Sequence, residues 1–273
     1  MTRIRKFDRR KFFSTTAAVS VLGLTIPMWA SQAFAAKRGG TLRISVNTSP
    51  SKLNPLLQRL SSEYLLGELL YSGLVRLGPN MEAVPDLAES WTSSADLTVW
   101  TFKLRAGAKF HNGQAMTAND VVTCLRAILD KKTGSPGRRN LGPIDSINEG
   151  AGGTVVIKTK VSYGDLPIAM AYTTAKIAPA DIVSNDLERL SREAIGTGPF
   201  KLVSYEPDRL IVVEKNSDYF LPEYPYLDRV EVMVFPDQAA EMAALISGEV
   251  DVALQVPLAE YKRVSASSGI DGM

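Results

Sequence analysis

The 273-residue sequence contains one cysteine and one histidine, and this scarcity excludes several kinds of chemistry. With only Cys124, the chain cannot form an internal disulfide or a thiolate metal cluster, and we expect a small buried apolar residue there. With only His111, it cannot build a metal site from several histidines of its own. The Gly-x-Ser-x-Gly and His-Glu-x-x-His patterns are also missing, which disfavours a hydrolase.

A surplus of charge of one sign is missing as well. The chain has 31 basic and 29 acidic side chains, and residues 1–35 hold six of the basic ones and a single Asp. The remaining 238 residues therefore carry 25 basic and 28 acidic groups, a net charge of −3. A slightly acidic body gives no reason to expect a nucleic-acid partner.

The sequence has no apolar run long enough to span a bilayer as a helix. The most apolar stretch, Ala17–Ala30, has 14 residues and contains Pro27, whereas a spanning helix needs roughly 17–25. Basic residues precede this stretch, and Ala33 and Ala35 follow it as the small residues that a signal peptidase requires. Together these features predict a secretory signal over residues 1–35.

The basic part of this signal indicates its export route. Arg9 and Arg10 precede Phe12 by the spacing of a twin-arginine motif, so we expect the twin-arginine export machinery to be a partner. A general secretory signal that contains an Arg-Arg pair, or a membrane anchor, is the alternative. No cysteine lies near the cleavage site, which argues against a lipid anchor. We expect a soluble periplasmic protein that begins near Ala36.

Beyond residue 36, strand and helix patterns are mixed, which predicts an α/β or α+β fold. Alternating or clustered apolar residues predict strands at 41–46, 100–105, 155–157 and 230–234, and a hairpin over 200–216. Helical spacing or capping residues predict helices over 62–74, after Thr117, and from Asp237 to Ser247. Glycine and proline predict an exposed loop over Lys131–Pro143 and a tight turn at Gly150–Gly153.

Seven short pieces in a fixed order carry a family resemblance. They are Gly39-Gly40-Thr41-Leu42, Leu53-Asn54-Pro55, Leu70-Tyr71-Ser72-Gly73-Leu74, Pro85–Trp91, Trp100–Gly113 with Thr117–Val121, Gly196-Thr197-Gly198-Pro199-Phe200, and Ile246–Asp251. In this order they resemble the family 5 extracellular solute-binding proteins of ABC importers, the dipeptide, oligopeptide and nickel group. The resemblance covers residues 37 to 262.

The resemblance implies a two-lobed, type II periplasmic binding protein fold with an inserted α/β subdomain. Residues 37–70 and 192–273 would form lobe I, and residues 71–191 the insert. Family members are about twice as long as this chain, so we expect a chain that lacks the second lobe, either as a fragment or through a broken reading frame. With one wall of the cleft absent, we expect solute to bind more weakly than in a full-length counterpart.

The resemblance also implies a function without catalysis. The loop after the first strand would face the ligand, so Asn47, Thr48 and Ser49 are the candidate ligand-binding residues, although an ordinary polar turn is an equally open interpretation. We expect a monomer without a cofactor that delivers a peptide or similar small solute to an ABC permease in the inner membrane. A sensory binding protein for a chemoreceptor and, less favoured, an exported hydrolase are the alternatives.

Other residues in the quoted pieces have local interpretations. Tyr71, Trp91 and Trp100 are expected to pack in the core, and Gly196 and Gly198 to permit a strained entry into the following strand. His111 is expected to be a turn residue, since Asn112-Gly113 supplies a tight turn. Nickel transport is an alternative within the resembled family, but nickel favours imidazole ligands and this chain has one histidine, so we expect no tight binding of free nickel.

Overall fold

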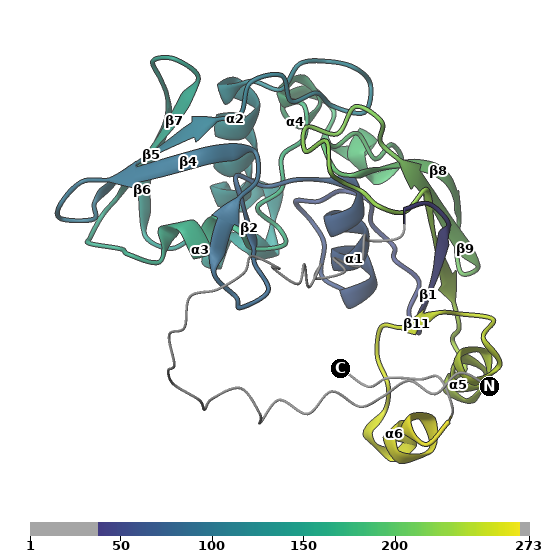
Figure 1. Ribbon diagram of the computed structural model, residues 1–273. Helices are drawn as coiled ribbons and strands as arrows, with labels where there is room; N and C mark the ends of the chain where they lie inside the picture. Colours follow the sequence, from purple (N-terminus) through teal and green to yellow (C-terminus); the bar gives the residue numbers. More distant parts are fainter. Residues whose placement is uncertain (1–37, 268–273) are drawn as a thin grey trace, which may run out of the picture. The chain divides into compact units, whose positions relative to one another are not determined.

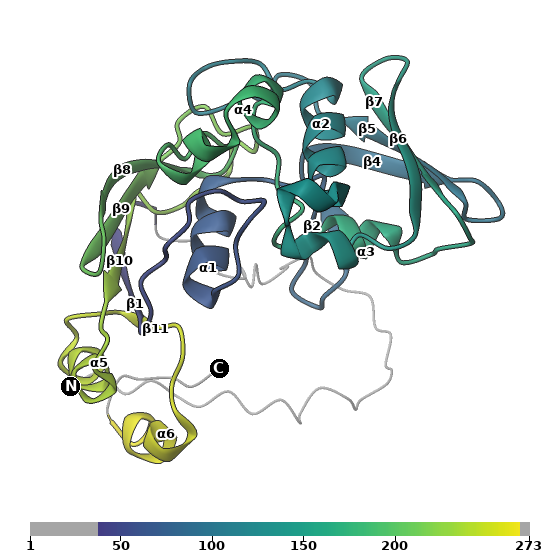
Figure 2. The same ribbon diagram turned by 180° about the vertical axis from the view of Figure 1, so that it is seen from behind.

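Two β-sheets organise the part of the chain that the computed structural model describes, residues 38–267 (Figure 1; Figure 2 gives the reverse view). The described residues all belong to one compact unit. The predicted signal segment, with Arg9, Arg10, Phe12, Ala33 and Ala35, lies outside the described residues. Among the described residues no helix is long and apolar enough to cross a membrane.

The five-stranded sheet joins the beginning of the described chain to its end. Its strand order is β11-β1-β10-β9-β8. The strands are β1 (Thr41–Val46), β8 (Phe200–Glu206), β9 (Leu210–Lys215), β10 (Arg229–Val234) and β11 (Val252–Ala253). Strand β1 runs parallel to both β10 and β11, while β8, β9 and β10 are antiparallel. The predicted first strand, hairpin and valine-rich strand are confirmed.

The second sheet is antiparallel and comes from the middle of the chain. Its order is β4-β5-β7-β6, and its strands are β4 (Ala88–Ser93), β5 (Val99–Leu104), β6 (Ile144–Gly150) and β7 (Thr154–Thr159). Helix α2 (Ala118–Leu129) contacts β6 and β7 (Figure 1). A separate short ribbon pairs β2 (Val75–Leu77) with β3 (Ala83–Pro85).

The other helices are short and mostly connect the strands. They are α1 (Ser61–Leu70), α3 (Leu166–Met170), α4 (Ala180–Asn185), α5 (Gln238–Ser247) and α6 (Leu258–Ser265), with 3₁₀ turns at Lys131–Thr133, Pro136–Arg139 and Leu187–Ser191. In both views α1 lies between the two sheets (Figure 1, Figure 2). Helix α1 contacts β8, which attaches it to the five-stranded sheet.

Local capping explains why α2 starts where the sequence predicts. The Thr117 backbone N–H donates to Asp120 Oδ2 at 2.7 Å, and the Thr117 hydroxyl donates to the same oxygen at 2.8 Å. The other Asp120 oxygen accepts from the backbone N–H of Ala180 at 2.8 Å, which links the starts of α2 and α4. Cys124 is fully buried on this helix, as predicted.

Helix α5 is likewise defined by its ends. The Asp237 carboxylate accepts from the Ala240 backbone N–H at 2.8 Å, and Gly248 adopts the left-handed conformation (φ 77°) that ends the helix. Both boundaries match the sequence prediction because capping depends only on neighbouring residues.

The predicted helix over 62–74 is wrong at its C-terminal end. Helix α1 ends at Leu70, and Tyr71 is extended (φ −132°). The chain that follows bonds to distant segments: the Leu70 carbonyl accepts from the Gly198 N–H at 3.1 Å and the Ser72 carbonyl from the Ile177 N–H at 3.0 Å. These tertiary hydrogen bonds replace the helical ones. The apolar spacing of the sequence gives no sign of them, because their partners lie more than 100 residues further along the chain.

The loop predicted over Lys131–Pro143 is also only partly exposed. It contains two 3₁₀ turns, and Ser135 and Leu141 are buried within it. The turn at Gly150–Gly153 is confirmed between β6 and β7.

Candidate functional site

The carboxyl ends of the parallel strands form one edge of the five-stranded sheet. Strand β1 ends at Val46 opposite Val234 of β10, and β11 pairs with the same half of β1. The chain leaves β1 at Asn47, so the predicted ligand loop starts at this edge. Ligands of open α/β sheets bind outside the carboxyl ends of strands.

Asn47 and Thr48 meet at this edge, and both side chains are exposed. The Asn47 amide donates to Gln255 Oε1 at 3.2 Å, and the Thr48 hydroxyl donates to Asn47 Oδ1 at 3.0 Å. Both residues line a cavity of about 160 Å³, together with residues at the start of α1 and after β11. Ser49 does not line it; its hydroxyl oxygen accepts from the Asp208 N–H at 3.0 Å, at the β8–β9 turn.

The side of this cavity formed by α1 offers further hydrogen-bonding groups. Ser61 Oγ accepts from the Gln255 amide at 3.3 Å. Ser62 also lines the cavity, is only 3% exposed, and its Oγ has no protein hydrogen-bond partner among the described residues. The lining thus combines amide and hydroxyl groups with no charged side chain, which suits the uncharged polar groups of a ligand, such as peptide amides, rather than a metal.

A buried carboxylate holds the segment between the loop and α1. Glu63 is 1% exposed and accepts four hydrogen bonds: from the Ser51 N–H at 3.2 Å, the Ser51 hydroxyl at 2.8 Å, the Arg59 N–H at 2.6 Å and the Leu60 N–H at 3.1 Å. Its negative charge also lies at the positive N-terminal end of the helix. The cavity wall is therefore preorganised, a role that the sequence pattern does not reveal.

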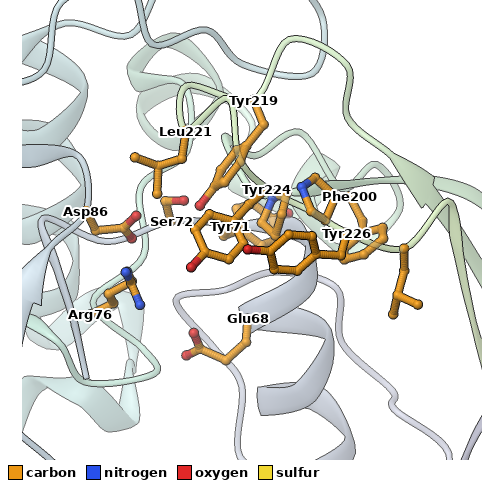
Figure 3. Close-up of a pocket in the computed structure, with 13 residues that line it drawn as sticks. Glu68, Tyr71, Ser72, Arg76, Asp86, Phe200, Tyr219, Leu221, Tyr224 and Tyr226 are labelled. Atoms are coloured by element: carbon orange, nitrogen blue, oxygen red, sulfur yellow. The ribbon is translucent and has the colours of Figure 1, made fainter. Parts of the chain in front are cut away.

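A larger cavity, whose lining side chains are drawn in Figure 3, has a volume of about 350 Å³. It lies near the opposite end of β1. One of its lining residues, Tyr226, accepts a backbone hydrogen bond from Gly39, just before β1 begins, at 2.7 Å. Its aromatic lining comes from Tyr71, Phe200, Tyr219, Tyr224 and Tyr226. The cluster of tyrosines at 219–226 is the sequence signal that could have pointed to this cavity.

The polar side of the larger cavity contains Asp86. This carboxyl is 3% exposed, and its Oδ2 accepts from the Gly73 N–H at 3.1 Å. Burial raises the pKa of Asp86 to about 6, and the Lys176 ammonium and the Gly73 N–H partly oppose that rise. Buried Lys176 is itself paired with Glu68 at 2.7 Å.

His111 packs against the Gly196-Thr197-Gly198 piece. The His111 ring places Nε2 3.1 Å from the Gly198 carbonyl oxygen and Nδ1 3.4 Å from that of Ala194. His111 does lie in a turn, as predicted, but it has partners that the sequence did not show. A Cβ on Gly196 would lie 2.0 Å from the Leu70 carbonyl oxygen, so close approach rather than strained φ explains the glycines.

The predicted packing of the aromatic residues agrees with their burial. Tyr71 is 1% exposed and Trp100 is 6% exposed, while Trp91 packs at 6.1 Å between ring centroids against Phe102. Tyr71 additionally lines the larger cavity. Within residues 38–267 no group of three or more His, Cys, Asp or Glu side chains is placed to hold a metal ion.

Comparison with known proteins defines the family. The chain matches bacterial extracellular solute-binding proteins, family 5 Middle, over residues 82–272. It is 28% identical over 234 residues to the oligopeptide-binding protein AppA of Bacillus subtilis, which covers 83% of this chain and 42% of AppA. It is 27% identical over 264 residues to the glutathione-binding protein GsiB of Escherichia coli K12, which covers 92% of this chain and 49% of GsiB.

A solved structure extends the comparison to the fold. The binding protein AgaA of A. tumefacien R10, in complex with agropinic acid, superposes with a TM-score of 0.79 at 30% identity, over 84% of this chain and 46% of AgaA. The expected periplasmic binding protein fold is thereby confirmed. These relatives are binding proteins rather than enzymes, and the chain spans about half the length of the curated relatives it matches. The chain belongs to the family 5 bacterial extracellular solute-binding proteins.

Proposed function

We propose that this chain forms part of the solute-binding component of an ABC import system. It captures a peptide or a similar small polar solute and delivers it to a membrane permease, and no bond is made or broken. Family membership carries this proposal. The names of the relatives refer to an oligopeptide, glutathione and agropinic acid, all of them small polar solutes.

The proposed binding surface is the sheet edge at Asn47 and Thr48. Its amide and hydroxyl groups can donate to and accept from the polar backbone of a peptide-like ligand. Ser62 Oγ supports this position because a buried hydroxyl without a protein partner can bond to a ligand or to water. Ser49, bonded at the β8–β9 turn, supports the loop in this proposal rather than contacting the solute.

The proposal includes a division of the chain into lobes. The five-stranded sheet takes its strands from residues 41–46 and 200–253, and the four-stranded sheet from 88–159. This supports the division into a discontinuous lobe I, 37–70 plus 192–273, and an insert, 71–191. A second lobe would then close over the edge at Asn47, a movement that a permease can recognise as a change of shape.

The proposed location is the periplasm, reached through the twin-arginine route with Arg9 and Arg10 in the signal. The family description as extracellular supports export in general.

Calorimetric titration with a panel of di- to octapeptides, glutathione and amino-acid–sugar conjugates tests the proposed site. We expect saturable binding of one class, weakened at least about tenfold in an Asn47→Ala/Thr48→Ala variant, since two hydrogen bonds are removed. The matched control is Asn80→Ala/Thr92→Ala, which removes the same groups from exposed positions elsewhere. Equal loss in both variants, or none in either, would exclude the loop as the binding surface.

A further inference from the structure

The larger cavity has an aromatic side and a charged side. Figure 3 shows the rings of Phe200, Tyr224 and Tyr226 on one side, while the carboxylate of Asp86 and the guanidinium of Arg76 lie next to each other on the other. No salt bridge joins Asp86 to Arg76 in the described part of the chain, so neither charged group is paired with the other.

Two polar atoms of this cavity have no hydrogen-bond partner in the described structure. They are Asp86 Oδ1 and the Tyr71 hydroxyl, on lining side chains that are 3% and 1% exposed, and only Asp86 Oδ1 is used as a ligand contact below. A buried carboxylate oxygen and a buried hydroxyl are both costly to leave unsatisfied. Asp86 already uses its Oδ2 for the Gly73 N–H, which fixes the carboxylate and leaves Oδ1 as an acceptor within the cavity wall.

The balance of charge around the cavity selects the kind of ligand. Glu68 lines the cavity, but Lys176 neutralises it at 2.7 Å. The remaining pair, Asp86 and Arg76, has one charge of each sign. A cation alone would be repelled by Arg76 and an anion alone by Asp86, whereas a zwitterion satisfies both.

We propose that this cavity binds an aromatic α-amino acid as its zwitterion, at a second ligand site separate from the sheet edge. The ammonium group donates to Asp86 Oδ1, and the carboxylate accepts from Arg76. The aromatic side chain packs among the rings of the cavity, where aromatic pairs add to the free energy of burial. A volume of about 350 Å³ is within the range of small-molecule sites.

The second site lies away from the edge at which the transported solute is proposed to bind. Lining residue Tyr226 is bonded to Gly39 before β1 begins, whereas Asn47 follows the end of β1. Occupation of one site can therefore be measured independently of the other, with variants of Asn47 and Thr48 as the reference.

Calorimetry with three probes tests the ligand class on the 273-residue chain. The probes are L-phenylalanine, phenethylamine, which lacks the carboxylate, and 3-phenylpropionate, which lacks the ammonium group. We expect one-site binding of L-phenylalanine with a dissociation constant of about 1 mM or tighter, and each truncated probe at least about tenfold weaker. Similar affinity for all three would show apolar adsorption only, and no binding of L-phenylalanine would overturn the proposal.

Variants then test the position of the site. Asp86→Asn and Arg76→Gln should each weaken L-phenylalanine binding at least about tenfold, as the loss of a charged contact does. Asp145→Asn and Arg139→Gln remove the same charges from exposed positions and should have no effect. Thermal unfolding checks whether Asp86→Asn is folded. If it is not, Arg76→Gln alone is the deciding variant, because Arg76 is exposed and its replacement leaves the core intact. Undiminished binding in Arg76→Gln, or loss in Asn47→Ala/Thr48→Ala, would overturn the assignment.

Discussion

The Nε2 atom of His111 lies 3.1 Å from the carbonyl oxygen of Gly198, which joins two sequence pieces that are 87 residues apart. The backbone reinforces this contact, because the His111 N–H donates to the Gly196 carbonyl at 2.8 Å. Gly198 in turn donates to Leu70 at the end of α1. Residues that carry the family resemblance thus hold α1 and the start of β8 together, and they lie outside the proposed ligand-binding edge.

Replacement of His111 should make stability less dependent on pH. Burial lowers the pKa of His111, so the folded state disfavours the protonated ring. The contribution of the neutral His111 ring to the free energy of unfolding is at its full value above the unfolded pKa of about 6.5. It is lost as the pH falls below that value. Urea unfolding at pH 7.5 and 5 should show a smaller decrease for His111→Gln than for the parent chain. An equal decrease in both chains would contradict this assignment.

Replacement of Glu63 should destabilise the chain and loosen the ligand loop. The carboxylate accepts four hydrogen bonds in the interior, so Glu63→Ala leaves buried donors without an acceptor. We expect a loss of about 3 kcal/mol in the free energy of unfolding, on the scale of hydrogen bonds to charged groups. Urea unfolding measures it, with exposed Glu188→Ala as the neutral control. A loss of no more than that of the control would show that Glu63 is dispensable.

Replacement of Asp86 should change the pH dependence in the opposite sense to His111. Its pKa is raised to about 6 in the folded state, so the folded state holds the proton more tightly than the unfolded one. The contribution of Asp86 to the free energy of unfolding is at its full value below about pH 4 and is lost as the pH rises through 6. The loss amounts to at most about 3 kcal/mol. Asp86→Asn keeps an acceptor for the Gly73 N–H but does not titrate.

The measurement for Asp86 is the difference in unfolding free energy between the parent chain and Asp86→Asn at pH 4.5 and 7.5. We expect the parent to lose stability relative to the variant as pH rises. A difference that stays constant over this interval would mean that Asp86 does not titrate there.

Export is predicted to depend on the arginine pair of the proposed signal segment. Lysine lacks the planar guanidinium group of arginine, so an Arg9→Lys/Arg10→Lys precursor should remain in the cytoplasm. Arg3→Lys/Arg5→Lys is the matched control and should be exported and cleaved near Ala36. Cell fractionation followed by N-terminal sequencing distinguishes the two, and normal periplasmic accumulation of the Arg9/Arg10 variant would reject the twin-arginine route.

The parts of the fold that could be predicted from the sequence are those fixed by neighbouring residues. Thr117 and Asp237 determine helix starts through contacts within three residues, and the alternation in 41–46 defines β1. The end of α1 could not be predicted, because it depends on hydrogen bonds that the distant Gly198 and Ile177 N–H groups donate to the carbonyls of Leu70 and Ser72.

The candidate site divides in the same way. Asn47 and Thr48 could be placed at the sheet edge because they follow the first strand directly. Ser62 and Gln255 could not be assigned to the same cavity, since they reach it from α1 and from the chain after β11. The larger cavity brings together Tyr71, Asp86 and Tyr219 from three distant segments, and their proximity exists only in the folded chain.

The most direct test of the proposed function is an NMR titration of the 273-residue chain with the solute class selected by calorimetry. Backbone amide shifts detect even weak binding and locate it residue by residue. The account predicts that the largest shifts fall at residues 46–48, 61–62 and 254–255, around the cavity at the end of β1. Saturable binding with its largest shifts elsewhere, or no shift at these residues with any solute of the panel, would contradict it.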